Sequence, residues 1–120
     1  MWRKRLALAF LAVHTLLAIG AAVTVAMAIP DNGDQAAWVW VLYIPIDLPA
    51  ALVYMPLTES LSDALLAGST DDYLNLLLFP TLGAVLVGGA QWAAGGWVIG
   101  AVVDALARRS RRAKAARTGS

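Results

Sequence analysis

The apolar residues of the chain fall into three long blocks separated by short polar stretches. The first block, 6–29, and the third, 73–103, contain no charged residue, and the second, 38–57, contains only Asp47. A helix that crosses a bilayer needs about 20 consecutive residues of predominantly apolar character. The pattern therefore predicts an all-α integral membrane protein, built as a small helical bundle from three apolar segments.

The composition supports this class and excludes several others. Of the 120 residues, 60% are hydrophobic and 14% are charged, whereas soluble domains contain about 25% charged residues. The chain has no cysteine and one histidine, which is too few ligands for the usual zinc sites. We therefore expect a single membrane domain over 1–120 with no catalytic site, no metal and no cofactor, and a protein that is not an enzyme.

The charged residues are sorted by sign along the sequence. All nine cationic residues lie within 1–5 and 108–120, and all eight acidic residues lie between Asp31 and Asp104. Because lysine and arginine favour the cytoplasmic side of a membrane, both termini are expected in the cytoplasm. The arginine- and alanine-rich usage is typical of a high-GC bacterium, so the plasma (inner) membrane is the expected location. The basic tail is expected to attract anionic lipid, at about 1 kcal/mol per cation near the surface, and not nucleic acid.

Two termini on one side require an even number of crossings, yet three apolar segments are present. In a first topology, the segment 38–57 is broken by prolines, dips into the membrane and returns to the outer side. A short interfacial helix then covers 58–68, and one long helix covers 73–107. In a second topology, 38–57 crosses fully and the last segment is a hairpin that turns near 88–96. In a third, there are three plain crossings and the basic tail lies outside. We favour the first topology, because it places the proline break in 38–57 at the point where the chain turns back.

The first segment has an alternative reading as a cleaved signal peptide. Ala26-Met27-Ala28 fits the small-residue pattern of a cleavage site. The apolar run of 6–29 is, however, longer than the roughly 7–15 residues of a signal peptide. We therefore expect an uncleaved transmembrane helix.

Other signals mark where the later helices begin and end. Gly68 is predicted to end the interfacial helix, and Ser69-Thr70-Asp71-Asp72 supplies capping and acidic residues for the start of the next one. Pro80 predicts a further helix boundary at the residue before it.

Asp47 lies between Pro45 and Pro49, inside the second apolar segment. The prolines remove backbone donors and disfavour helix just before themselves, so Asp47 is predicted to be the N-cap of a helix that opens at Leu48. The alternative is a proton- or cation-handling site. A charged carboxylate at the bilayer centre costs on the order of 2.5–3.5 kcal/mol, so such residues commonly serve a function. The local sequence favours the capping role.

Two further ionisable residues are candidates for a functional site. His14 lies within the first apolar segment, where it could pair with Asp47 or Asp104 in a proton relay. A lone histidine beside Thr15 more often serves helix packing. Asp104 precedes Arg108 by one helical turn, which predicts an ion pair between them.

A stripe of small residues marks one face of the third segment. Its members recur at three- and four-residue spacing and are Gly89, Ala93, Gly96 and Gly100, with Gln91 beside them. Such stripes let two helices approach closely in a membrane. The partner is expected to be the first segment, a second copy of the chain, or a larger membrane protein.

These observations predict a small multi-pass membrane protein with a non-enzymatic role. The first hypothesis is an accessory or self-associating subunit that packs through the glycine-striped helix. The alternative is a small oligomeric transporter or pore that uses Asp47, with His14, as an intramembrane ionisable site.

Overall fold

The computed structural model describes residues 1–66 and 73–119, and over these ranges the chain is helical with no strand. The predicted all-helical fold is therefore confirmed. The elements are α1 (Trp2–Asn32), the 3₁₀ turn η1 (Gly33–Ala37), α2 (Trp38–Asp47), α3 (Ala51–Leu66), the π-helical turn η2 (Tyr73–Leu78), α4 (Phe79–Gly83), the π-helical turn η3 (Ala84–Gly88) and α5 (Gly89–Thr118).

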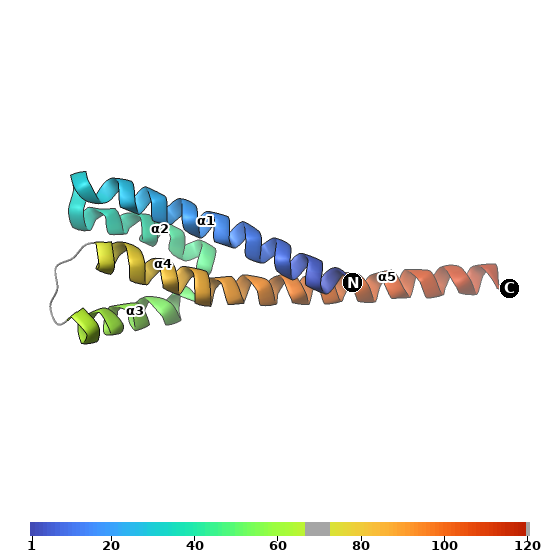
Figure 1. Ribbon diagram of the computed structural model, residues 1–120. Coiled ribbons are helices and arrows are strands. Elements are labelled where there is room, and N and C mark those ends of the chain that lie inside the picture. The colour runs from blue at the N-terminus through green and yellow to red at the C-terminus, as the bar shows by residue number, and fades with distance from the viewer. Residues whose placement is uncertain (67–72, 120) are drawn as a thin grey trace.

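The molecule is elongated, with extents of 74 × 27 × 18 Å. Helix α1 runs antiparallel to the helical stretch from η2 to α5, and α2 and α3 lie beside them over part of their length (Figure 1). We call the end that holds η1 and the last turn of α3 the loop end. The opposite end, where α1 begins and α5 extends beyond the other helices, is the tail end.

Helices α2 and α3 form a hairpin that starts from the loop end and turns back near the middle of the bundle (Figure 1). Near the loop end, the Trp40 indole N–H donates a hydrogen bond to the Leu76 carbonyl (2.6 Å). At the turn, residues 48–50 connect the two helices with a cis Leu48-Pro49 bond, and the Gln91 side chain binds the Leu48 carbonyl. Helix α3 then runs back along η3 and α4, so both ends of the hairpin lie at the loop end.

The break between α2 and α3 differs in detail from the prediction. Pro45 lies inside α2, and the helix ends only before Leu48, which is extended with φ −66° and ψ 138°. Pro49 explains this conformation, because a proline disfavours the α region for the residue before it. Since α3 begins at Ala51, Asp47 ends one helix and does not open the next. The predicted N-cap role of Asp47 is therefore wrong.

The structure also differs from the interfacial helix predicted at 58–68 and from the hairpin turn considered at 88–96. Helix α3 continues through Pro56 to Leu66, so the described part of 58–68 is not a separate helix but the end of a longer one. The boundary predicted before Pro80 is present as a change from the π-helical turn η2 to α4 at Phe79. The chain nevertheless stays helical from Tyr73 to Thr118, so no hairpin turn lies at 88–96. The π-helical turn η2 directly precedes the Pro80 region, and such wide turns commonly accommodate an irregular hydrogen-bond ladder. The predicted signals at 68–72 lie outside the described residues.

Helices α1 and α5 approach each other through the predicted glycine stripe. A Cβ added to Gly96 would lie 2.8 Å from the Leu6 carbonyl carbon, and one added to Gly100 would lie 2.7 Å from the Arg3 nitrogen. Both glycines therefore face main-chain atoms of α1, which cannot move aside as a side chain can. Gly89 meets the Leu11 side chain (3.2 Å from its added Cβ), and Ala93 is half-buried on the same helix.

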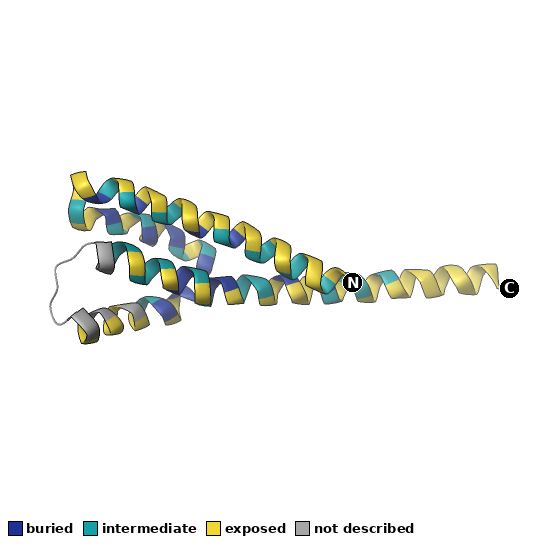
Figure 2. Ribbon diagram, viewed as in Figure 1, coloured by how far each residue is buried: buried dark blue, intermediate teal, exposed yellow. Residues whose placement is uncertain are grey.

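Much of the helix surface is exposed (Figure 2), and it carries many large apolar side chains. The stretches 2–47 and 76–118 each contain helix that is long and apolar enough to cross a membrane. Large side chains such as Leu16, Leu42 and Leu86 are 70%, 77% and 67% exposed. A helix that is apolar on its outer as well as its inner face is typical of a membrane span.

The close contact between α1 and α5 predicts how glycine substitutions will act. Gly96→Ala or Gly100→Ala should destabilise the protein by about 1–3 kcal/mol, because the added methyl group forces the two backbones apart. Gly95→Ala is the matched control, since an added Cβ there meets nothing within 4 Å. The measurement is the free energy of unfolding in mixed micelles titrated with sodium dodecyl sulfate. An equal effect of all three substitutions would contradict this packing.

Candidate functional site

The side chains of His14 and Asp47 meet in the middle of the bundle. His14 Nε2 lies 2.5 Å from Asp47 Oδ1, and both side chains are 0% exposed. His14 projects from α1 and Asp47 from the last turn of α2, and the short η1 connection brings these helices side by side. The structure thus joins two of the three predicted ionisable candidates into one buried pair.

Two buried tyrosines complete the cluster. The Tyr54 hydroxyl donates a hydrogen bond to Asp47 Oδ2 (2.7 Å), and the Tyr43 hydroxyl lies 3.1 Å from His14 Nε2. The sequence analysis did not identify either tyrosine. Tyr43 precedes Asp47 by four residues, so helical spacing alone would have placed both on one face of α2. Tyr54 lies beyond the break, and no local pattern connects it to the pair.

Glycines at the junction of η3 and α5 make room for the pair. A Cβ added to Gly88 would lie 2.7 Å from Asp47 Cγ, and one added to Gly89 would lie 3.8 Å from His14 Nδ1. The long helix therefore presents bare backbone to the cluster. His14 Nδ1 has no hydrogen-bond partner among the described residues.

The hydrogen-bond geometry suits a site that binds a proton. With Asp47 ionised, His14 Nε2–H donates to Oδ1, and Nδ1 carries a free lone pair. The pair then holds one negative charge in an apolar interior, which is costly. Uptake of one proton removes the net charge. Among the described residues, no three histidine, cysteine, aspartate or glutamate side chains come together as a metal site.

Helix α5 satisfies the backbone groups that the hairpin turn leaves free. The Gln91 side chain donates to the Leu48 carbonyl (2.8 Å) and accepts from the Ala50 N–H (2.7 Å). The Trp92 indole N–H donates to the Ile46 carbonyl (3.0 Å). These bonds pair main-chain groups at helix ends that have no partner within their own helix. Gln91, predicted as a packing residue, thus holds the tip of the hairpin.

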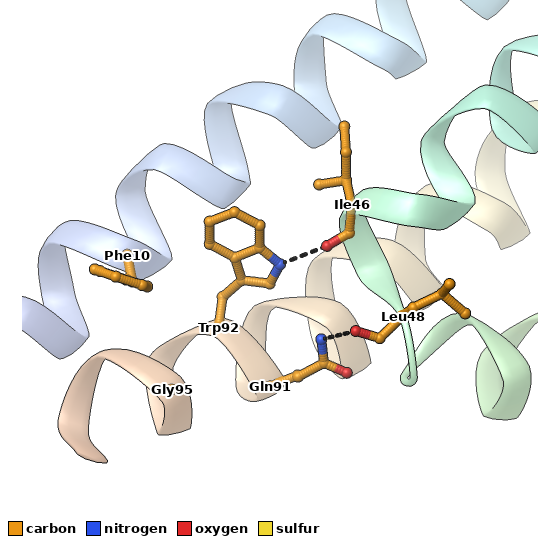
Figure 3. Close-up of a pocket in the computed structure, with 6 residues that line it drawn as sticks. All are labelled: Phe10, Ile46, Leu48, Gln91, Trp92 and Gly95. Atoms are coloured by element: carbon orange, nitrogen blue, oxygen red, sulfur yellow. Dashed lines mark hydrogen bonds between the residues drawn. The ribbon is translucent and has the colours of Figure 1, made fainter. Parts of the chain in front are cut away.

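A pocket of about 310 Å³ lies on the tail-end side of this tip (Figure 3). Its lining residues come from α1, the hairpin tip and α5 and are Phe10, Ile46, Leu48, Gln91, Trp92 and Gly95. The Trp92 ring packs against the rings of both Phe10 and His14, with centroid distances of 6.0 Å and 5.5 Å. The indole therefore contacts the buried pair and also lines the pocket.

The third ionisable candidate, Asp104, lies at the tail end, away from this cluster. Its carboxylate accepts a hydrogen bond from the Trp2 N–H (3.3 Å) and lies 3.9 Å from Arg3 Nε. The predicted pair with Arg108 is thus replaced by contacts to the start of α1. Partial desolvation raises the pKa of Asp104, but the Trp2 hydrogen bond and nearby positive charges, including Arg108, outweigh it and hold the pKa below its ordinary value.

Comparison with known proteins adds no assignment to this site. No protein-family model, curated protein or solved structure matches the chain. The chemistry of the site therefore follows from its own residues and their contacts.

The hydrogen bonds of Gln91 lead to a specific prediction. Gln91→Leu should destabilise the protein by about 1–3 kcal/mol, because it leaves the part-buried Ala50 N–H without its acceptor and also removes the bond to the more exposed Leu48 carbonyl. Gln35→Leu, an exposed position in η1, is the control and should change stability by less than about 0.5 kcal/mol. Detergent-titrated unfolding followed by tryptophan fluorescence measures both. Equal stability of the two variants would show that the turn does not depend on Gln91.

Proposed function

We propose that this chain is an integral membrane protein in which α1 and the stretch 73–103 cross the bilayer and the α2–α3 hairpin enters and leaves on one side. The ten residues of α2 span about 15 Å at 1.5 Å per residue. That length is half of a hydrocarbon core of about 30 Å. The hairpin tip would then lie near the bilayer centre, with both termini in the cytoplasm of a bacterial cell, as the cationic ends predict.

Within this arrangement, the proposed function is the transport of protons across the membrane. The observation that carries it is the 2.5 Å contact between His14 and Asp47, both fully buried at the tip of the hairpin. Ionisable side chains inside a membrane are costly and commonly mark ion pathways or proton relays. His14 is hydrogen-bonded to a carboxylate, and its other ring nitrogen has no partner in the part of the chain that the structure describes. It therefore has an acceptor for an arriving proton and a neighbour to which it can pass one.

The proposal favours the second of the two functional hypotheses from the sequence. An accessory subunit that associates through the glycine stripe has less support, because Gly96 and Gly100 are already in contact with α1. A small transporter or pore, assembled as an oligomer in the plasma membrane, uses the buried pair instead. The exposed basic part of α5 remains available to anionic lipid at the membrane surface.

Single cysteines test the topology, since the chain has none of its own. The positions are Gln35 and Asp63 near the loop end and Ser110 in the basic part of α5, all exposed. On intact cells, a membrane-impermeant maleimide should label cysteine at Gln35 and Asp63 and should label Ser110→Cys only after permeabilisation. Labelling of Gln35→Cys without Asp63→Cys would mean that the hairpin crosses the membrane fully.

Proton movement tests the role of the pair directly. In liposomes that hold the purified protein, a potassium diffusion potential should drive proton flux, read from a pH-sensitive dye inside. Asp47→Asn should lower the flux at least tenfold, because the amide keeps the shape of the side chain but cannot take up the proton. Asp34→Asn, an exposed acid in η1, is the control. Equal flux in all three folded proteins, or no flux in the parent, would rule out this function.

A further inference from the structure

The pocket at the hairpin tip contains polar groups at a depth where the proposed bilayer would be apolar. Its lining includes the non-helical residue Leu48 and the amide of Gln91. Irregular backbone at membrane depth is tolerated only where protein buries it or where it lines a cavity that holds water. Leu48 is 46% exposed, so protein alone does not cover this turn. The pocket therefore has the character of an aqueous entry into the membrane from the tail end.

The Trp92 side chain links this pocket with the buried pair. The Trp92 ring is part of the pocket lining and also lies 5.5 Å from the His14 ring. Its indole N–H is fixed by the Ile46 carbonyl at the hairpin tip. The unpartnered Nδ1 of His14 faces α5 at Gly89, one helical turn from Trp92. Movement of one ring would thus connect the pocket with a free acceptor.

On the loop-end side, the described residues next to the pair include an apolar cavity. Tyr54, which binds Asp47, also lines a cavity of about 240 Å³ between α3 and the long helix. The remaining lining residues are apolar and are Leu57, Leu61, Phe79, Leu82, Gly83, Leu86 and Val87. Water gains no hydrogen-bond partners along such a surface. Among the described residues, the tail-end pocket thus presents the Gln91 amide beside apolar residues, whereas the loop-end cavity is apolar apart from Tyr54.

We propose that the tail-end pocket is the water-filled entrance through which protons reach His14 and Asp47, and that the Trp92 ring is the residue that closes it. The inference rests on the proposed function and adds the direction and the route of proton entry. A hydronium ion in the pocket gives its proton to His14 Nδ1 and leaves as water. The Nε2 proton then moves to Asp47 Oδ1, so both side chains end neutral.

Few other groups take part in this exchange. Tyr43 from α2 and Tyr54 from α3 are the titratable side chains that contact the pair. The long helix presents Gly88, Gly89 and Trp92 to it, none of which titrates. Among the described residues, the proton balance therefore involves His14 and Asp47 with the two tyrosine hydroxyls.

Two glycines with open space around them test the entrance without reference to transport. Gly95 lines the pocket, Gly20 lies on the outer face of α1, and an added Cβ meets nothing within 4 Å at either. In liposomes, a water-soluble methanethiosulfonate should modify Gly95→Cys at least tenfold faster than Gly20→Cys, as measured by mass spectrometry. Equally slow reaction at both positions would overturn the water-filled entrance.

Chemical modification of His14, the single histidine of the chain, tests whether Trp92 closes the entrance. Diethyl pyrocarbonate should modify His14 at least tenfold faster in Trp92→Ala than in the parent. Trp92→Phe keeps a ring in place and should react slowly, which separates the loss of the closing ring from the loss of the indole hydrogen bond. Unchanged modification in Trp92→Ala would overturn the role of Trp92.

The outcomes also separate this inference from the proposed function. Fast modification of Gly95→Cys together with proton flux that does not depend on Asp47 would leave an aqueous pocket but no transport role. Flux that depends on Asp47, with Gly95→Cys as unreactive as Gly20→Cys, would keep the transport role and reject this route of entry.

Discussion

The arrangement of the chain depends on the contact between one carboxylate and one imidazole in an apolar interior. Asp47 has 0% exposure, so both of its oxygens need partners within the protein. His14 on α1 and Tyr54 on α3 supply them, which ties the end of α2 to helices on either side. The buried pair is therefore a constraint on the fold as well as a candidate site.

The hairpin turn imposes a second requirement, since breaking a helix exposes main-chain groups. Gln91 and Trp92 pair those groups from the neighbouring helix, and Gly88 allows the carboxylate to lie against the helix backbone. One short stretch of the long helix thus provides space for the acid, partners for the turn and the ring beside the pocket. The residues that stabilise the hairpin turn are therefore also the ones that surround the candidate site.

The two ends of the molecule are held by different forces. At the tail end, close contact of glycines with the α1 backbone is joined by polar contacts between Asp104 and the first residues of α1. Toward the loop end, an apolar groove of about 340 Å³ lies along α1 and the stretch from η2 to α4, lined by residues such as Ala22 and Leu77. The backbones of α1 and α5 thus lie closest toward the tail end, and the hairpin fills the wider part of the bundle, where most of the buried core lies.

The sequence by itself determined the helical class, the apolar exterior and the close approach through Gly96 and Gly100, because these follow from periodicity and residue size. It also placed an acid and a break in the second segment. It did not determine which side of the break Asp47 belongs to, and local capping rules chose wrongly. The position of Asp47 depends on its contacts with His14, Tyr54 and Gly88, of which His14 and Gly88 lie far from it in the sequence. Only tertiary packing decides such a contact, since the energy of a buried carboxylate depends on the groups that surround it in space.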